Sequence, residues 1–518
     1  MGVAWQLPAG NPTVLAAGFV ELAAQLGVRQ VADTRDPVAS VHGALAAIPD
    51  RWLLVFDNAP DQASIERFLP PAGRGRVVVT SQNQNWPHGK ALQVPVLGTD
   101  VSAGFLVSRT GDQDQQAAAE LARELGGLPL ALEQAAAYVL ATGGTLARYL
   151  DFFRRRRADM LHRGEPAGYS GTVATTWALA FARLEQTAPE AAGLLRLLAC
   201  YASEAVPLRL LLQFRPGLAE QLRDEVAPVL MPLIDDPLAA DDAVAALRRY
   251  SLVTPAANRA VSVHRLVQVV TADEMSAESA AAWRQAAAML IEAAIPGAPQ
   301  QPDTWHDFAA LLPHAQAALA DSDGLERVAA YLGFQGSYQA AFDLQRRVLR
   351  DRELALGPEH PSALITRANL ARWCGEAGDP AGARDEFAAL APALEQVLGP
   401  EHPTTLTAVA ALARFTGEAG DAAAARDQLA MVLPAFERVL GPQHPDTLIT
   451  RASLAISSGD AGDAAGARDQ YAALLPVEER ILGPQHPETL TARANLAAFT
   501  GDAGDAREPA TSTPPCSP

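Results

Sequence analysis

The sequence has few of the features that mark secreted, membrane or nucleic-acid-binding proteins. Its three cysteines, Cys200, Cys374 and Cys516, stand far apart without metal-ligand spacing, which favours a reducing compartment over secretion. No apolar run reaches about eighteen residues, and no basic-then-apolar signal pattern opens the chain. The net charge of −18 argues against nonspecific binding to nucleic acid or an anionic membrane. We therefore expect a cytoplasmic protein with neither nucleic acid nor membrane as a partner.

A phosphate-binding loop of the pattern G-x-x-x-x-G-K-[ST] is also missing from the sequence. The Gly89-Lys90 pair has Gln84 where the leading glycine belongs, and Ala91 where the magnesium-binding hydroxyl belongs. Phosphoryl transfer depends on such groups for positioning and charge stabilisation. We therefore assign no catalytic residue and expect no ATPase activity.

Two short apolar runs stand out in the first hundred residues. RWLLVFDN at 51–58 and RVVVTS at 76–81 are uninterrupted and closed by polar residues, which predicts strands buried on both faces of a parallel sheet. Another strand is expected at 1–7, and helices are expected between the strands, as in α/β folds. Asp57 then lies at the carboxyl end of a strand, where phosphates and magnesium gather in such folds.

A third motif, Gly126-Gly127-Leu128-Pro129, separates two predicted helices at 113–125 and 128–140. The two strand motifs and this one follow the order found in the NB-ARC module of STAND signalling ATPases, which the chain resembles. The resemblance implies a partial nucleotide-binding domain without a phosphate loop, a helical subdomain, a winged-helix-like region and a helical linker. Their predicted bounds are 1–110, 111–170, 171–275 and 276–323.

The resemblance implies a nucleotide site that would take ADP or ATP with Mg²⁺. In it, Asp57 orders magnesium, Thr80 and Ser81 end the sensor strand, Pro129 lies against adenine, and His264 contacts the β-phosphate of ADP. Each residue also has a plain structural interpretation: a strand cap for Asp57, a proline in a first helical turn, and a histidine at the edge of the core.

The chain departs from the family pattern at three residues that directly follow members of this site. Asn58 stands where a second carboxylate would act as base, Gln82 replaces the arginine that reads the terminal phosphate, and Arg265 follows His264 where the family has aspartate. These departures leave the occupancy of the site by nucleotide open.

From about residue 324 the sequence repeats itself. Gly-Pro-(Glu/Gln)-His begins at Gly357, Gly399, Gly441 and Gly483, in steps of 42 residues. Small and apolar residues recur along one helical face in each unit, which predicts a helix-turn-helix solenoid. Residues 324–505 resemble kinesin-light-chain-type tetratricopeptide repeats.

Two further expectations concern residues that recur inside the repeats. The second helix of a repeat contains Pro392, Pro434 or Pro476, each of which predicts a kink or break. The histidines at 360, 402, 444 and 486 are too far apart in sequence to share an ion and each precedes a proline, so we assign them to helix starts and predict no metal site.

The repeats suggest a surface for a protein or peptide ligand. The resemblance implies that first-helix residues clamp a peptide backbone, and the candidate residues are Arg367, Asn369, Arg451, Arg493 and Asn495. The alternative is an ordinary solvated helix surface. Residues 506–518 are rich in proline, serine and threonine and are expected to be disordered.

The predicted fold class is multidomain α/β plus α, in which a partial parallel-sheet domain precedes a winged-helix region and an α-solenoid. The resemblance implies a bacterial regulatory or signalling protein that acts through protein contacts of its repeats and assembles into oligomers. The alternative is a pure peptide-binding scaffold, built on a degenerate nucleotide fold that holds no nucleotide.

Overall fold

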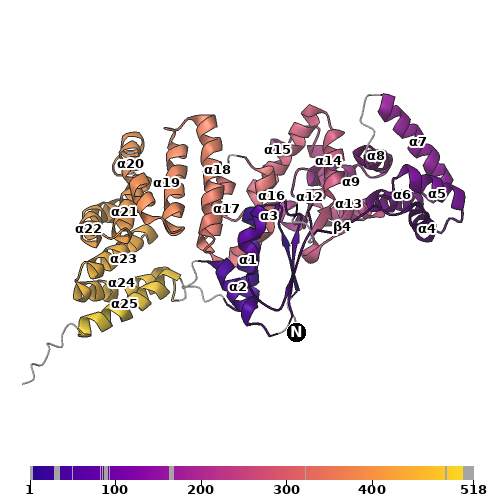
Figure 1. Cartoon of the computed structure of the whole chain (residues 1–518). Coiled ribbons are helices and arrows are strands. Elements are labelled where there is room, and N and C mark those ends of the chain that lie inside the picture. The colour runs from indigo at the N-terminus through magenta and orange to yellow at the C-terminus, as the bar shows by residue number, and fades with distance from the viewer. Residues whose placement is uncertain are drawn as a thin grey trace, which may run out of the picture. The chain divides into compact units, whose positions relative to one another are not determined.

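The computed structural model describes residues 4–28, 36–49, 51–81, 83, 86, 91–92, 94–162, 169–320, 322–484 and 487–505. The chain divides into two compact units, one made of residues 1–84 and 329–518 and the other of residues 85–328 (Figure 1). The first unit contains the parallel sheet and most of the repeats. The second is largely helical. The predicted tail at 506–518 lies outside the described residues.

The N-terminal segment forms the parallel sheet that the sequence predicts. Its strands β1 (Ala4–Pro8), β2 (Leu53–Asp57) and β3 (Arg76–Val79) lie in the order β1-β2-β3. Helices α1 (Pro12–Gln25), α2 (Pro37–Ala47) and α3 (Gln62–Ile65) and the 3₁₀ turn Glu66–Phe68 connect the strands. Asn11 and Asp36 begin the two longer helices, because their side chains accept backbone N–H groups that the first turn leaves unpaired.

The expectation that both strands are buried on both faces is wrong. In β2, Leu54 and Phe56 are buried on one face, whereas Leu53 on the other face is 37% exposed. In β3, Val77 and Val78 point to opposite faces, yet 36% and 48% of their surfaces are exposed. Helix α1 packs on β2, where the ring of Phe19 from α1 lies 6.2 Å from that of Phe56. β3 is an edge strand of the described sheet, so its apolar run reflects strand propensity more than burial.

The second unit is built mainly from helices. They are α4 (Thr99–Thr110), α5 (Gln115–Glu124), α6 (Pro129–Thr142), α7 (Leu146–His162), α8 (Tyr169–Thr187), α9 (Pro189–Leu198), α10 (Leu208–Leu211), α11 (Leu218–Gln221), α12 (Ala227–Asp235), α13 (Pro237–Arg249), α14 (Arg265–Asp273), α15 (Ala277–Ala294) and α16 (Trp305–Ala318). Two 3₁₀ turns lie at Ala257–Arg259 and Pro302–Thr304. Strands β4 (Val253–Pro255) and β5 (Val261–Val263) form an antiparallel hairpin, and the winged-helix-like character of this region stays a prediction.

The Gly126-Gly127 pair separates α5 from α6, as the sequence predicts. Both glycines have a positive φ, which side chains disfavour. A Cβ on Gly127 would lie 2.1 Å from the carbonyl oxygen of Leu97, so the segment before α4 passes directly over this turn.

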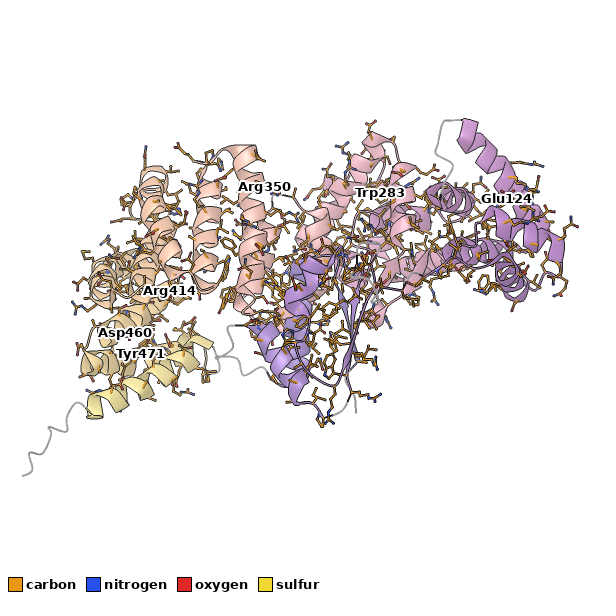
Figure 2. All side chains as sticks on the ribbon, viewed as in Figure 1. Glu124, Trp283, Arg350, Arg414, Asp460 and Tyr471 are labelled. Atoms are coloured by element: carbon orange, nitrogen blue, oxygen red, sulfur yellow. The ribbon has the colours of Figure 1, made fainter. Side chains whose placement is uncertain are left out.

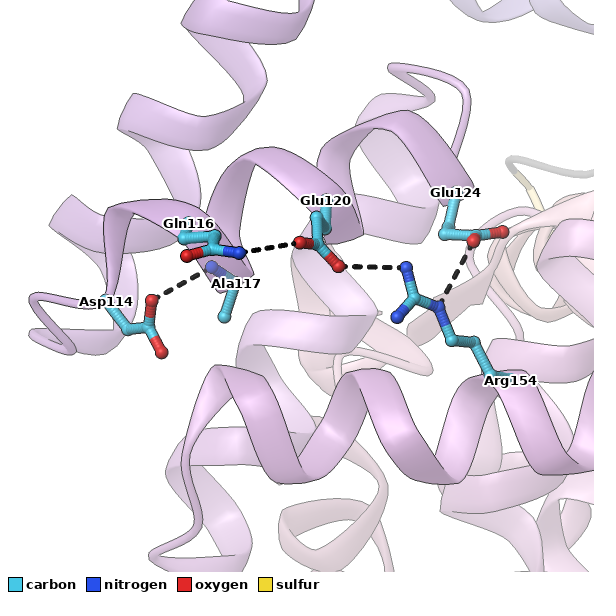
Figure 3. A network of polar contacts seen from close by, with 6 residues as sticks. All are labelled: Asp114, Gln116, Ala117, Glu120, Glu124 and Arg154. Atoms are coloured by element: carbon cyan, nitrogen blue, oxygen red, sulfur yellow. Dashed lines mark hydrogen bonds and ion pairs between the residues drawn. The ribbon is translucent and has the colours of Figure 1, made fainter.

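Ion pairs connect helix α7 to helix α5. Arg154 donates to Glu120 at 3.0 Å and to Glu124 at 3.3 Å, which lie one turn apart on α5 (Figure 3). At the start of α7, the Leu146 N–H donates to Asp112 Oδ2 at 2.8 Å. These contacts hold α7 at both its beginning and its middle.

The predicted solenoid of paired helices is confirmed. Its helices are α17 (Asp323–Phe334), α18 (Tyr338–Leu356), α19 (Pro361–Glu376), α20 (Pro380–Leu398), α21 (Pro403–Glu418), α22 (Ala422–Val439), α23 (Pro445–Asp460), α24 (Ala464–Ile481) and α25 (Pro487–Asp505). The odd-numbered helices are the first helices of the repeats. Successive first helices contact one another from α19 to α25, so they form one layer of the array.

The repeated histidines begin the first helices, as the sequence predicts. Nδ1 of His360, His402 and His444 accepts the backbone N–H two residues later, at 3.2, 3.2 and 3.3 Å. A ring nitrogen that accepts a hydrogen bond carries no proton, so each histidine caps its helix in the neutral form. His486 lies outside the described residues. Among those that are described, no group of three or more histidine, cysteine or acidic side chains is placed to hold a metal.

The predicted break at the second-helix prolines is wrong, because α20, α22 and α24 run without interruption through Pro392, Pro434 and Pro476. Each proline leaves unpaired the carbonyl four residues earlier, on Ala388, Ala430 or Ala472. These three alanines and the prolines are exposed, so water can hydrogen-bond to the freed carbonyls.

Candidate functional site

The ends of β2 and β3 are joined by a polar network that we call the strand-end cluster: Gln6, Asp57, Asn58, Thr80 and Ser81. The Thr80 hydroxyl donates to Asp57 Oδ1, and the amide of Gln6 donates to Asp57 Oδ2 at 3.2 Å. The N–H of Asn58, a residue with φ of 59°, donates to Thr80 Oγ1 at 2.8 Å. Both carboxylate oxygens of Asp57 therefore accept hydrogen bonds from neighbouring strands.

Ser81 extends this network to the loop that follows β2. Its hydroxyl donates to the carbonyl of Ala59 at 2.6 Å and accepts the N–H of Asn83 at 3.0 Å. The Asn83 amide donates to the carbonyl of Pro60 at 3.1 Å. The cluster thus fixes the two strand ends and the loop between them, which is the role that the strand-cap interpretation of Asp57 requires.

The strand-end cluster holds one carboxylate, and both of its oxygens already accept hydrogen bonds from Thr80 and Gln6. The Ser81 hydroxyl also donates within the protein. The cluster contains no arginine or lysine to neutralise phosphates, and the chain's single lysine, Lys90, lies outside the described residues. The five residues of the cluster therefore supply no cation for ADP or ATP, and the binding of nucleotide and Mg²⁺ stays a prediction.

The structure brings Asp57, Thr80 and Ser81 together, whereas Pro129 and His264 belong to the second unit. Pro129 occupies the first turn of α6. His264 begins α14, and its Nδ1 accepts the N–H of Leu266 at 3.2 Å. Burial lowers the pKa of the His264 imidazole, which favours the neutral ring. This capping geometry is that of the repeat histidines, and the nucleotide roles of both residues stay predictions.

The candidate arginines of the repeats all form ion pairs in one recurring geometry. Arg451 pairs with Glu437 at 2.6 Å and Arg493 pairs with Glu479 at 2.7 Å, and Arg367 pairs with Glu353 in the same way. Each glutamate lies 14 residues earlier, on the preceding second helix. These arginines join neighbouring repeats, and their role in peptide binding stays a prediction.

The candidate asparagines differ from each other in their surroundings. Asn495 donates to Tyr471 Oη at 3.0 Å, and that hydroxyl donates to the carbonyl of Ala452 at 3.1 Å. Burial, the main cause, raises the pKa of Tyr471 to about 12. Asn369 is half-buried on α19. The structure therefore commits Asn495 to an internal contact, and the clamp role of both asparagines remains untested.

The exposed face of the first helices carries residues that the sequence analysis missed. Arg372, Arg414 and Ile456 occupy one repeat position, in successive steps of 42 residues, and Ile449 lies two turns before Ile456. We call these four residues the first-helix face. Ile449 and Ile456 are 43% and 37% exposed. The signal in the sequence is that this position varies while its neighbours repeat.

The two arginines of this face are held in different ways. Arg414, labelled in Figure 2, pairs with Glu376 at 2.8 Å and Glu418 at 3.0 Å. The guanidinium of Arg372 lies 4.3 Å from the centre of the Trp373 ring. Its Nε is buried and has no hydrogen-bond partner among the described residues. The face therefore offers two exposed isoleucines, next to repeats in which the same position holds a half-buried arginine.

Comparison with known proteins identifies tetratricopeptide repeats in this chain, at residues 321–389 and 405–446. Residues 182–280 match a domain of unknown function, DUF7779. A nucleotide-binding leucine-rich repeat (NLR)-like protein of Hyaloscypha variabilis is 25% identical over 417 residues, 69% of this chain. The chain spans 39% of the length of that relative.

Two solved structures are similar to parts or most of the chain. Kinesin-light-chain TPR-like repeats from Podosopora anserina are 24% identical, with 35% of this chain and 86% of that chain covered and a TM-score of 0.30. A STAND protein with a tetratricopeptide repeat sensor from Pyrococcus horikoshii is 10% identical, with 97% and 87% covered and a TM-score of 0.35. Separately, no helix in the described part of the chain is long and apolar enough to cross a membrane.

Proposed function

We propose that this chain is a regulatory protein of the STAND type that acts through peptide contacts of its repeats. The distant NLR-like relative and the tetratricopeptide segments support the general class. The observation that carries the proposal is the first-helix face, because the exposed side chains of Ile449 and Ile456 lie two turns apart on one helix and form an apolar surface that a partner can bury.

The chemistry of the first-helix face limits the kind of peptide it takes. Ile449 and Ile456 would cover apolar side chains. Arg414 is paired with two glutamates and the Nε of Arg372 is buried, so the arginines add little to a ligand. We expect an extended peptide whose apolar residues contact the two isoleucines.

Selection of a random peptide library on the full chain tests this function. We expect saturable binders whose affinity falls at least about tenfold in the double variant Ile449→Ser/Ile456→Ser, because two apolar contacts are lost. Ile481→Ser is the control, since Ile481 is 40% exposed but lies on the second helix α24. A library without saturable binders, or binders indifferent to the double variant, would contradict the proposal.

Nucleotide binding is the second element of the STAND proposal, and the residues of the strand-end cluster predict that it is weak or absent. ATP hydrolysis by the full chain is expected to equal the buffer background, because no phosphate-neutralising cation joins Asp57 in the cluster. Phosphate release is the measurement. Turnover that Asp57→Ala abolishes would overturn the expectation.

Calorimetry with ADP separates the regulatory switch from the pure scaffold. Micromolar binding that His264→Ala removes would support a nucleotide-dependent switch. If ADP does not bind while peptides do, the chain works as a scaffold on a degenerate nucleotide fold.

A further inference from the structure

The second unit contains a cavity that none of the roles above explains. Its volume is about 420 Å³, and it lies between α6, α7 and α8. Arg148 of α7 and Arg183 of α8 line it together with Tyr138, Phe152 and Leu179. The volume is within the usual range of small-molecule sites, about 300–1,000 Å³. We call this space the Arg148–Arg183 cavity.

The charge of the cavity is opposite to that of the protein as a whole. The chain carries 59 acidic and 41 basic residues, yet no aspartate or glutamate stands among the described residues that line the cavity. Neighbouring arginines are neutralised: Arg155 pairs with Asp151 at 2.8 Å, and Arg196 pairs with Glu185 at 2.5 Å. Within the described part of the chain, no ion pair involves Arg148 or Arg183.

The two guanidinium groups act on a common neighbour, the hydroxyl of Tyr138. Burial raises the pKa of Tyr138, while the charges of Arg183 and Arg148 oppose that rise. Both arginines also line the same cavity, from α7 and from α8. An anion bound in this cavity would be attracted by two cations.

Aromatic and aliphatic side chains line the cavity next to the arginines. The guanidinium of Arg148 lies 5.3 Å from the centre of the Phe152 ring, and Leu179 lines the cavity from α8. The Tyr138 ring lies 5.2 Å from that of Tyr149, which also lines the cavity. These side chains offer an apolar surface to the organic part of a ligand.

The helices that carry these residues are fixed without a ligand. Arg154 holds α7 to α5, as Figure 3 shows. On α8, the ring of Trp177 stacks on Phe181 at 4.5 Å and Arg196 covers the Phe181 ring at 5.0 Å. These contacts hold α7 against α5 and α8 against α9, and none of them involves a residue that lines the cavity.

We propose that the Arg148–Arg183 cavity binds a small organic anion, whose carboxylate or phosphate group meets the two arginines and whose flat apolar body lies against Phe152 and Leu179. Arginine favours both anionic groups because its planar fork can donate two parallel hydrogen bonds. The site is independent of the peptide and nucleotide proposals.

Calorimetry on the full chain with benzoate, phenyl phosphate and neutral benzamide tests the site. We expect saturable binding of at least one anion and none of benzamide. Tighter binding of phenyl phosphate would identify phosphate monoesters as the ligand class, and tighter binding of benzoate would identify carboxylates.

Variants connect any binding to the two arginines. Arg148→Gln and Arg183→Gln should each weaken the anion at least about tenfold, as expected for loss of a charge-assisted hydrogen bond. Arg155→Gln is the control, because it removes an arginine from the same helix that does not line the cavity. Unchanged circular dichroism and Tm would show that the variants fold.

Three outcomes would overturn the proposal. They are no saturable binding of either anion at millimolar concentration, equal binding of benzamide and the anions, or anion binding that Arg148→Gln and Arg183→Gln leave unchanged.

Discussion

Replacing Gly375 by alanine is expected to lower the free energy of unfolding of the repeats by roughly 2 kcal/mol. This is the usual cost of inserting an extra methyl group into a well-packed core. A Cβ at this position would lie 2.1 Å from Cε1 of Phe415, which is fully buried. Phe415 has little room to move, because its ring stacks on Phe387 with 5.9 Å between centres. Alanine is normally the better helix residue by about 1 kcal/mol, so the change would reverse the usual order.

This contact recurs along the first helices. Gly333 meets Trp373 and Gly459 meets Phe499, and in both cases the added Cβ would lie 2.2 Å from the ring. In each pair the aromatic residue follows its glycine by 40 residues, one repeat along the array. At these positions the absence of a side chain on glycine leaves room for an aromatic ring from the next first helix.

Gly501 is the matched control for this substitution. It lies within α25, and no atom lies within 4 Å of its added Cβ. Gly501→Ala should therefore leave stability unchanged or raise it by up to about 1 kcal/mol. Urea denaturation of the full chain measures both variants. A Gly375→Ala protein as stable as the wild type would show that Phe415 shifts at little cost.

The repeats could be predicted from the sequence in detail because their period fixes many residues at once. A spacing of 42 residues places the histidine caps and the small helical face without any tertiary information. A helix break at the prolines was predicted wrongly because the sequence does not show whether the carbonyl they free is exposed to water, and a kink there stays a prediction. In the structure those carbonyls belong to exposed alanines.

The ion pairs between repeats were readable in the sequence but were not recognised. Glu353 and Arg367 recur as Glu437 and Arg451, and as Glu479 and Arg493, always 14 residues apart. The one exception is informative: Val409 stands where the arginine belongs, and Glu395 is exposed. Because the glutamate and the arginine occur together in the same repeats, the sequence indicates an ion pair between them. The arginines considered alone had suggested contact with a ligand.

The candidate nucleotide residues could be predicted only in part. Asp57 and Thr80 end adjacent strands, so strand order alone brings them together. His264 depends on tertiary placement, which a motif does not provide, and the Arg148–Arg183 cavity combines three helices that no sequence pattern links.

The last described repeat is expected to lose stability as pH rises, because of Glu478. This side chain is 2% exposed and occupies a position where Leu394 and Phe436 stand in earlier repeats. Burial, followed by the nearby charge of Glu488, raises the pKa of Glu478 from its ordinary value of 4.5 to about 7. Among the described residues its Oε2 has no hydrogen-bond partner.

The direction of the effect follows from proton binding. Between pH 4.5 and about 7 the folded protein keeps the proton of Glu478 while the unfolded chain has lost it. Unfolding then releases a proton, so the free energy of unfolding falls by up to about 1.4 kcal/mol per pH unit. The stabilisation is complete below pH 4.5 and is lost as pH rises through about 7, with a total on the order of 3 kcal/mol.

Glu478→Leu should remove this dependence and stabilise the repeat most above pH 7, since Leu394 is fully buried at the equivalent position. Amide hydrogen exchange of α25 between pH 5 and 8, corrected for intrinsic exchange, measures local opening. Glu479→Gln is the control: it changes the neighbouring carboxylate, which pairs with Arg493 on the surface, and should keep the wild-type slope. Protection of α25 that stays constant with pH in the wild type would mean that Glu478 reaches solvent or a cation in solution.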